Sequence, residues 1–124
     1  MKSTKNFNPD VDTKMKCTCC GQGGISIATL IVLEDVRRHF DKPVTITSGA
    51  RCESYNKKVG GTKRSEHLIT ESEPLADAVD IVVEDVSPTQ VYLYLKNTAY
   101  ASLLGLGKYK EFTHVDTRGY AARW

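Results

Sequence analysis

Apolar residues recur at helical spacing between Ile25 and Phe40, and this pattern predicts the longest helix of the chain. Positive charge gathers at its end, at Arg37, Arg38 and His39, where it favours a helix C-terminus. The apolar face comprises residues three or four positions apart and their neighbours: Ile25, Ala28, Leu30, Ile31, Val32, Leu33, Val36 and Phe40. We therefore expect this helix to lie on the core.

A second helix is predicted from Ser87, because Ser87-Pro88-Thr89-Gln90 supplies a capping serine, a proline at the first helical position and a glutamine at the third. A shorter helix is predicted over Cys52–Val59, where Gly60 and Gly61 end it. Strands are predicted at four short runs of apolar and β-branched residues: Val44–Ser48, Ala78–Val83, Leu104–Tyr109 and Phe112–Thr117. This order of elements favours an α+β fold, a single domain whose helices flank a small antiparallel sheet.

Length and composition agree with one domain, since the chain has 124 residues, 40% of them hydrophobic and 26% charged. Residues 1–16 are polar and are predicted to form an N-terminal arm, with the domain spanning 17–124. A net charge of +2 gives no electrostatic reason to expect nucleic acid as a partner. No apolar run approaches the roughly 18 residues of a membrane span, so we expect no membrane insertion.

The N-terminal lysines precede no apolar segment of the kind found in secretory signals. We therefore expect the protein to be made in the cytoplasm. We also expect it to be a monomer. Any action outside the cytoplasm then requires an export route that the sequence does not encode.

Four cysteines lie at Cys17, Cys19, Cys20 and Cys52. Cys17 and Cys20 have the C-x-x-C spacing of a zinc knuckle, but no second such pair follows, so Cys52 is the one distant thiol that could join them. A disulfide to Cys52 is equally allowed in an oxidising compartment. The interpretation we favour is that small buried thiols pin the N-terminal turn under the core.

Of the three histidines, His39 lies at the polar end of a predicted helix and is expected on the surface. His67 lies in a loop, and His114 lies in a predicted strand. Asp80 interrupts the apolar strand Ala78–Val83, and a buried carboxylate costs several kcal/mol unless it is paired or binds a cation. Two imidazoles and one carboxylate make a catalytic zinc set with one position open for water.

Several short motifs follow one another along most of the domain, from about residue 17 to 118. They are Thr47-Ser48-Gly49-Ala50-Arg51, Tyr55-Asn56, Val59-Gly60-Gly61, Ser65-x-His67, Ala78-Val79-Asp80-Ile81 and His114-Val115-Asp116. In this order they resemble the zinc D-alanyl-D-alanine carboxypeptidase family, and more narrowly its small phage and prophage peptidases. The resemblance implies the fold shared with the hedgehog signalling domain, a Zn2+ cofactor, and a peptidoglycan stem peptide as substrate.

Residue by residue, the resemblance implies that zinc is bound by His67, Asp80 and His114. It implies that Arg51 reaches the substrate carbonyl or carboxylate. Ser65, beside the first ligand, is similar to a serine that contacts substrate or steadies the loop.

The chain departs from the family pattern between the first two ligands. In the family the second ligand lies seven positions after the first, whereas Asp80 lies thirteen positions after His67 here. Asp77 is a rival ligand by distance, but it lacks the apolar strand that follows Asp80. The six extra residues are expected to form a bulged loop beside the metal, and its carboxylates would modify substrate access.

Two residues compete for the role of general base. Glu111 lies three residues before His114, a spacing that several branches of the family use for the acid that takes a proton from water. Asp116, two residues beyond His114, would otherwise be the base or the partner of a ligand imidazole. We favour Glu111 as the base.

The function implied is that of a zinc-dependent D,D-carboxypeptidase or endopeptidase that cuts peptidoglycan peptides, as a phage endolysin or wall hydrolase acting at the bacterial cell wall. The alternative is a non-catalytic module of the same fold that binds wall peptides or a virion partner. A purely structural assembly protein is disfavoured by the set of Arg51, His67, Asp80 and His114.

Overall fold

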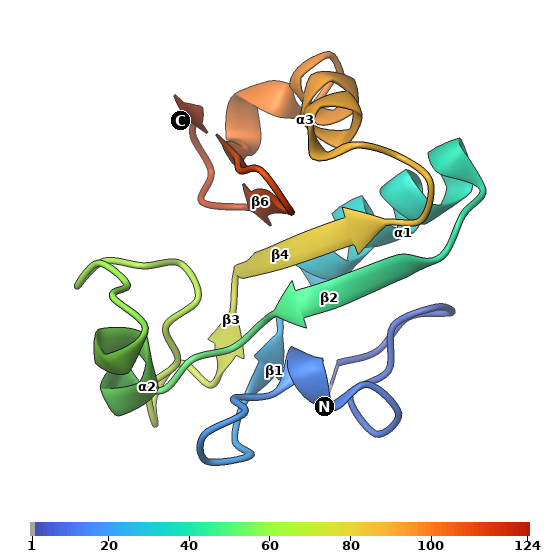
Figure 1. Cartoon of the computed structure of the whole chain (residues 1–124). Coiled ribbons are helices and arrows are strands. Elements are labelled where there is room, and N and C mark those ends of the chain that lie inside the picture. The colour runs from blue at the N-terminus through green and yellow to red at the C-terminus, as the bar shows by residue number, and fades with distance from the viewer. Residues whose placement is uncertain (1) are drawn as a thin grey trace.

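The computed structural model describes residues 2–124 and confirms an α+β fold (Figure 1). Its main sheet has five strands in the order β2-β4-β6-β5-β7. In that order the strands are β2 (Val44–Ser48), β4 (Ala78–Val83), β6 (Thr113–Asp116), β5 (Gly105–Lys108) and β7 (Ala122–Arg123). The first four are the predicted strands, and each pairs antiparallel with its neighbour.

The edge of the sheet differs from the expectation of a purely antiparallel arrangement. β7 pairs parallel with β5, so the sheet is mixed. β7 has only two residues, so it carries no alternating pattern from which a strand could be predicted. It pairs with β5 because the chain returns alongside that strand.

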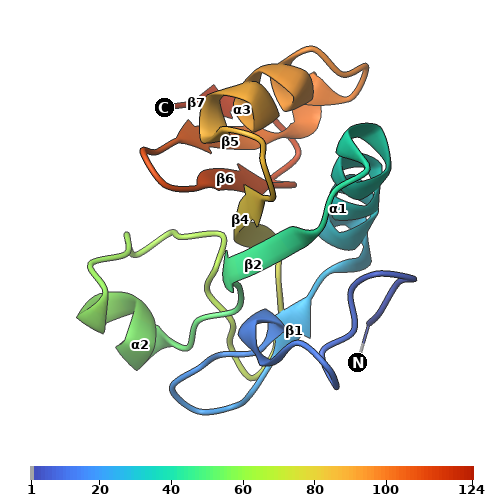
Figure 2. The same cartoon turned by 45° about the vertical axis from the view of Figure 1, so that its right-hand side comes forward.

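Two longer helices pack on the sheet: α1 (Ile27–Phe40) contacts β2 and β4, and α3 (Pro88–Lys96) contacts β5, β6 and β4 (Figure 2). The predicted capping box of α3 is confirmed, because the Ser87 hydroxyl accepts from the Gln90 N–H and the Gln90 side chain accepts from the Ser87 N–H. The helices meet where the Tyr94 hydroxyl donates to Asp35 over 2.8 Å.

The start and the face of α1 differ from the prediction. Ser26 caps the helix, and Ile25 lies before it in a strand. Ile31 is 61% exposed and Ala28 is also exposed, so the buried face is narrower than the run of apolar residues suggested. It consists of Thr29, Leu30, Val32, Leu33 and Val36.

The N-terminal residues pack on the domain below β2 (Figure 1). Phe7 and Met15, from the segment predicted as an arm, belong to the core, and Met15 lies in a short 3-10 helix (Thr13–Met15). β1 (Gly24–Ile25) then pairs parallel with β3 (Leu75–Ala76), which forms a small second sheet. The segment predicted as an arm thus supplies core side chains.

The short helix α2 (Glu53–Lys58) follows β2, and Cys52 is its first flanking residue. None of the helices in the described part of the chain is long and apolar enough to cross a membrane.

Candidate active site

Two neighbouring strands hold the centre of the site, because their register sets Asp80 of β4 opposite His114 of β6. Side chains alternate between the faces of a strand, so Val79 and Ile81 enter the core while Asp80 lies on the other face. His114 Nδ1 lies 3.0 Å from Asp80 Oδ1, and both side chains are buried. The hydrogen bonds of the sheet therefore fix the relative positions of these two groups.

His67 reaches the same point from a loop that backbone contacts hold in place. The Arg51 N–H donates to the His67 carbonyl over 2.8 Å, and the Ser65 hydroxyl accepts from the His67 N–H over 3.2 Å. On the ring, Nδ1 lies 2.8 Å from the carbonyl oxygen of Gly49. A carbonyl oxygen can only accept, so this contact assigns the ring proton to Nδ1 and leaves a lone pair on Nε2.

This Nε2 atom is buried and has no hydrogen-bond partner among residues 2–124, although it lies 3.3 Å from Asp80 Oδ1. One donor atom from each of His67, Asp80 and His114 lies within 4.8 Å of the other two. We call these three residues the histidine–aspartate group. An unpaired buried nitrogen costs about 1–3 kcal/mol, and a metal ion satisfies such a lone pair. The donor set, two imidazoles and a carboxylate, fits a bound metal ion.

Hydrogen bonding stabilises the ionised carboxylate of this group. Burial raises the pKa of Asp80, but contacts led by the hydrogen bond from His114 outweigh it and lower the pKa to about 2. Burial lowers the pKa of His114, yet its contacts with Asp116 and Asp80 raise it overall above its ordinary value. Asp80 therefore offers an anionic oxygen at neutral pH.

Asp116 contacts His114 from the other side of the imidazole ring. Its Oδ2 lies 2.7 Å from His114 Nε2, the ring nitrogen that does not face Asp80. Asp116 is fully buried and accepts from Arg118 through Nε at 2.8 Å and a terminal nitrogen at 2.7 Å. Burial raises the pKa of Asp116, but Arg118 and His114 outweigh it and hold the pKa well below its usual value. A carboxylate in this place orients a metal-binding imidazole.

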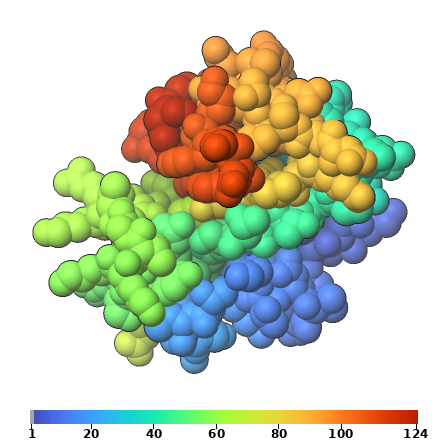
Figure 3. Space-filling view, in the orientation of Figure 1, coloured from blue at the N-terminus to red at the C-terminus, as the bar shows by residue number. Residues whose placement is uncertain are grey.

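A cavity of about 730 Å³ opens over the histidine–aspartate group. It lies between the green segment after α2 and the red C-terminal strands, which form its two sides (Figure 3). Arg51, Ser65 and Arg118 contribute polar groups to its lining. Its other prominent feature is a set of aromatic side chains: Tyr109, Phe112, Tyr120 and Trp124.

Contacts with three neighbouring side chains hold the Arg51 side chain in place. Its side chain is 15% exposed and donates to Ser48 Oγ at 3.2 Å and to Asn56 Oδ1 at 3.4 Å. A terminal nitrogen lies 3.4 Å from Asp80 Oδ2. The Arg51 side chain therefore contacts the Asp80 carboxylate of the histidine–aspartate group and also lines the cavity.

The structure does not bring Glu111 to the site. This residue is exposed in the turn between β5 and β6 and is not among the described residues that line the cavity. Glu66 does line it and, within residues 2–124, is the one carboxylate there besides Asp80. Burial raises the pKa of Glu66, as do the charges of Asp116 and Asp77. In the sequence, the position of Glu66 directly before His67 is the signal that identifies it as a carboxylate of the site.

The six extra residues between His67 and Asp80 lead away from the site. Residues 70–74 are exposed, and the chain then enters β3, which pairs with β1. In the described part of the chain, neither Glu71 nor Glu73 lines the cavity. Contrary to the expectation that the carboxylates of this loop modify substrate access, the structure places them outside the cavity lining. Asp80, rather than its rival Asp77, lies with the two histidines.

The model of one protein family, Peptidase M15, matches residues 6–116, which is nearly the whole chain. The chain belongs to the Peptidase M15 family. The match confirms the resemblance to the zinc D-alanyl-D-alanine carboxypeptidases that the motifs indicated. No curated protein sequence matches the chain. Peptidases of this family depend on a metal ion, and this M15 peptidase has a buried donor group for one.

Proposed function

We propose that this M15 peptidase is a zinc-dependent D,D-carboxypeptidase or endopeptidase that hydrolyses peptide bonds in bacterial peptidoglycan. The observation that carries the proposal is the convergence of His67, Asp80 and His114 at the base of a cavity in a chain of this family. The motif resemblance to small phage and prophage peptidases supports a role as an endolysin or wall hydrolase, acting at the bacterial cell wall.

The lining of the cavity supports a short peptide with a free carboxylate as substrate. Arg51 and Arg118 present guanidinium groups, which suit a substrate carboxylate or carbonyl oxygen. The aromatic side chains give the cavity an apolar wall, and Trp124 lies 4.9 Å from the His114 ring, measured between ring centres. Small apolar side chains such as those of alanine residues fit against such a wall.

Zinc is the ion we propose, and it would be held by His67 Nε2, His114 Nδ1 and a carboxylate oxygen of Asp80. A zinc ion there supplies a Lewis acid for the scissile carbonyl and lowers the pKa of a water molecule. Asp116 holds the proton on His114 Nε2, so that Nδ1 faces the other donors.

Proton transfer then requires a carboxylate inside the cavity. Glu66 is our candidate to accept a proton from water and return it to the leaving amine, because it lines the cavity and Glu111 does not. Arg51 is placed to donate a hydrogen bond to the oxygen on which negative charge develops.

The proposal is tested with zinc-loaded protein on purified peptidoglycan and on a synthetic stem peptide that ends in D-Ala-D-Ala. We expect mass spectrometry to show either loss of the terminal D-alanine or cleavage of cross-links, and His67→Ala to show neither. The first product would identify a carboxypeptidase and the second an endopeptidase. Co-sedimentation with cell walls without either product would instead favour the non-catalytic binding module.

A further inference from the structure

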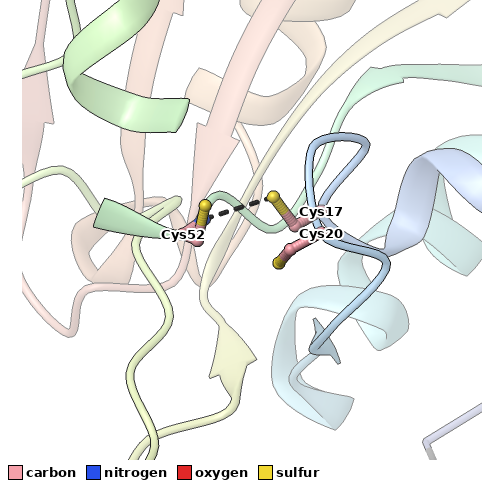
Figure 4. A group of neighbouring side chains, drawn as sticks. All are labelled: Cys17, Cys20 and Cys52. Atoms are coloured by element: carbon pink, nitrogen blue, oxygen red, sulfur yellow. Dashed lines mark hydrogen bonds between the residues drawn. The ribbon is translucent and has the colours of Figure 1, made fainter. Parts of the chain in front are cut away.

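The cysteines form a second donor cluster, outside the described lining of the cavity. The sulfur atoms of Cys17, Cys20 and Cys52 lie within 4.8 Å of one another, and we call these residues the thiol group (Figure 4). Cys17 is buried and Cys52 is half-buried, but Cys20 is exposed. The expectation that buried thiols merely pin the turn under the core is therefore wrong for Cys20 and also for its exposed neighbour Cys19.

The turn that carries Cys17 and Cys20 is closed by its own backbone. The Gly21 N–H donates to the Cys17 carbonyl over 2.7 Å, and the Cys17 N–H donates to the Gln22 carbonyl over 2.8 Å. Gly21 has a φ of 72°, a left-handed conformation that glycine adopts without strain. The C-x-x-C pair thus projects both sulfurs from one tight turn, as a zinc knuckle requires.

Cys52 joins this turn from 35 residues away in the chain. Its backbone N–H donates to Cys17 Sγ over 3.3 Å, which ties the Cys52 backbone to the turn that carries Cys17. Zinc–sulfur bonds of about 2.3 Å in tetrahedral geometry put ligand sulfurs about 3.8 Å apart. The three sulfurs, which lie within 4.8 Å of one another, are thus spaced close to the distances of a zinc site.

We propose that Cys17, Cys20 and Cys52 bind a second, structural zinc ion, with Cys19 as the fourth ligand. Structural zinc sites are four-coordinate, and Cys19 is a free, exposed thiol in the same turn as Cys20. This site is separate from the histidine–aspartate group and needs none of its residues.

Such an ion would tie the N-terminal segment to the wall of the cavity. Cys52 directly follows Arg51, whose backbone N–H and carbonyl bond to His67 and Ile69. The N-terminal segment contributes little regular structure of its own, since its elements span two or three residues each. Fixing the Cys52 backbone therefore fixes the stretch of chain that positions both Arg51 and the His67 loop.

The test is metal content and cobalt spectroscopy of the full chain purified under reducing conditions. We expect two zinc ions per chain, one of which is released by a mercurial that reacts with thiolates. After exchange with Co2+ alone, we expect sulfur-to-cobalt charge-transfer absorption in the near ultraviolet. Cys20→Ser should lose this absorption and one zinc ion, whereas Ser54→Ala, which removes a hydroxyl 3.5 Å from the Cys52 sulfur, should keep both.

His114→Ala separates this proposal from the proposed function, because it should lose the other zinc ion and keep the charge-transfer absorption. Cys19→Ser should weaken binding of the thiol-bound zinc, and unchanged binding would remove Cys19 from the ligand set. One zinc ion per wild-type chain with no mercurial-sensitive fraction would overturn the proposal. A disulfide in the reduced preparation, seen by intact mass, would overturn it as well, and neither result requires a variant to fold.

Discussion

The histidine–aspartate group and the thiol group are built on different supports. In the first, Asp80 and His114 lie on paired strands, and only His67 comes from a loop. In the second, all three cysteines lie in turns or at a helix end. The hydrogen bonds of a buried sheet open rarely, whereas an exposed turn with few buried contacts opens more readily unless a ligand holds it. The first group is therefore preorganised for chemistry, and the second is suited to joining segments.

The largest effect is expected from removing a ligand on the sheet. His114→Ala should abolish peptide hydrolysis and zinc binding at the histidine–aspartate group, because one of three donors is lost. The matched control is His39→Ala, whose imidazole is exposed and stacks on Tyr94. Activity and bound zinc are measured together, and hydrolysis by His114→Ala at the wild-type rate would show that the group is not the catalytic centre.

Next in size is the loss of the proposed proton acceptor in the His67 loop. Glu66→Gln should lower kcat by about 10²–10⁴-fold with zinc retained, since general base catalysis contributes about that much. Glu111→Gln serves as the control, because Glu111 is exposed and lies outside the described lining of the cavity. A large loss in Glu111→Gln with normal turnover in Glu66→Gln would return the role to Glu111.

A smaller effect is expected from changing Asp116, which contacts the His114 ring. Asp116→Asn should weaken zinc binding at the histidine–aspartate group by about 10–100-fold, because the carboxylate that orients the His114 ring is lost. Competition with a chromophoric chelator measures this affinity, and the thiol group should be unaffected. If affinity stayed normal while kcat fell, Asp116 would act in catalysis and not in positioning.

The different supports of the two donor groups are tested by removing all metal from the wild-type protein. Amides of residues 17–25 should then exchange with solvent deuterium about 10-fold faster, which corresponds to about 1.4 kcal/mol of local stability. Amides of β4 and β6 should keep their protection, because the sheet holds them. Hydrogen exchange followed by mass spectrometry gives both values, and equal loosening of the two regions would show that the sheet and the turn depend on metal to the same degree.

The smallest effect concerns a junction that involves neither donor group. Asp35 accepts from Tyr94, Tyr100 and Arg38, and Asp35→Asn should cost about 1 kcal/mol of unfolding free energy. Burial raises the pKa of Asp35, but these donors hold it below 3.8, so this stabilisation is present above pH 3.8 and fades as pH falls through the folded value.

The same junction should also weaken in alkali. Burial and Asp35 raise the pKa of Tyr94 to about 12 from 10.0, so the stabilisation is complete below pH 10 and is lost as pH rises through the folded value. Urea unfolding of wild type and Asp35→Asn across this range measures the difference. A difference that did not change with pH would contradict the ionised contact.

Local patterns in the sequence were sufficient for most elements of the fold. The Ser87 capping box, the alternation of Val44–Ser48 and the apolar run of Ala78–Val83 depend on neighbours in the chain, and these elements form as predicted. The motifs around His67, Asp80 and His114 likewise identified a set of residues that could bind a metal ion, because a buried carboxylate in an apolar strand requires a partner. The family resemblance drawn from the motifs is confirmed.

Tertiary structure alone decided which residues face the cavity and which thiols meet. Glu66 and Glu111 each lie close in sequence to a histidine of the site, yet the turn between β5 and β6 exposes Glu111 while the His67 loop brings Glu66 to the cavity. Cys52 meets Cys17 across 35 residues because β2 ends beside the N-terminal turn. Such long-range contacts depend on how strands pair and loops close, and no local pattern encodes them.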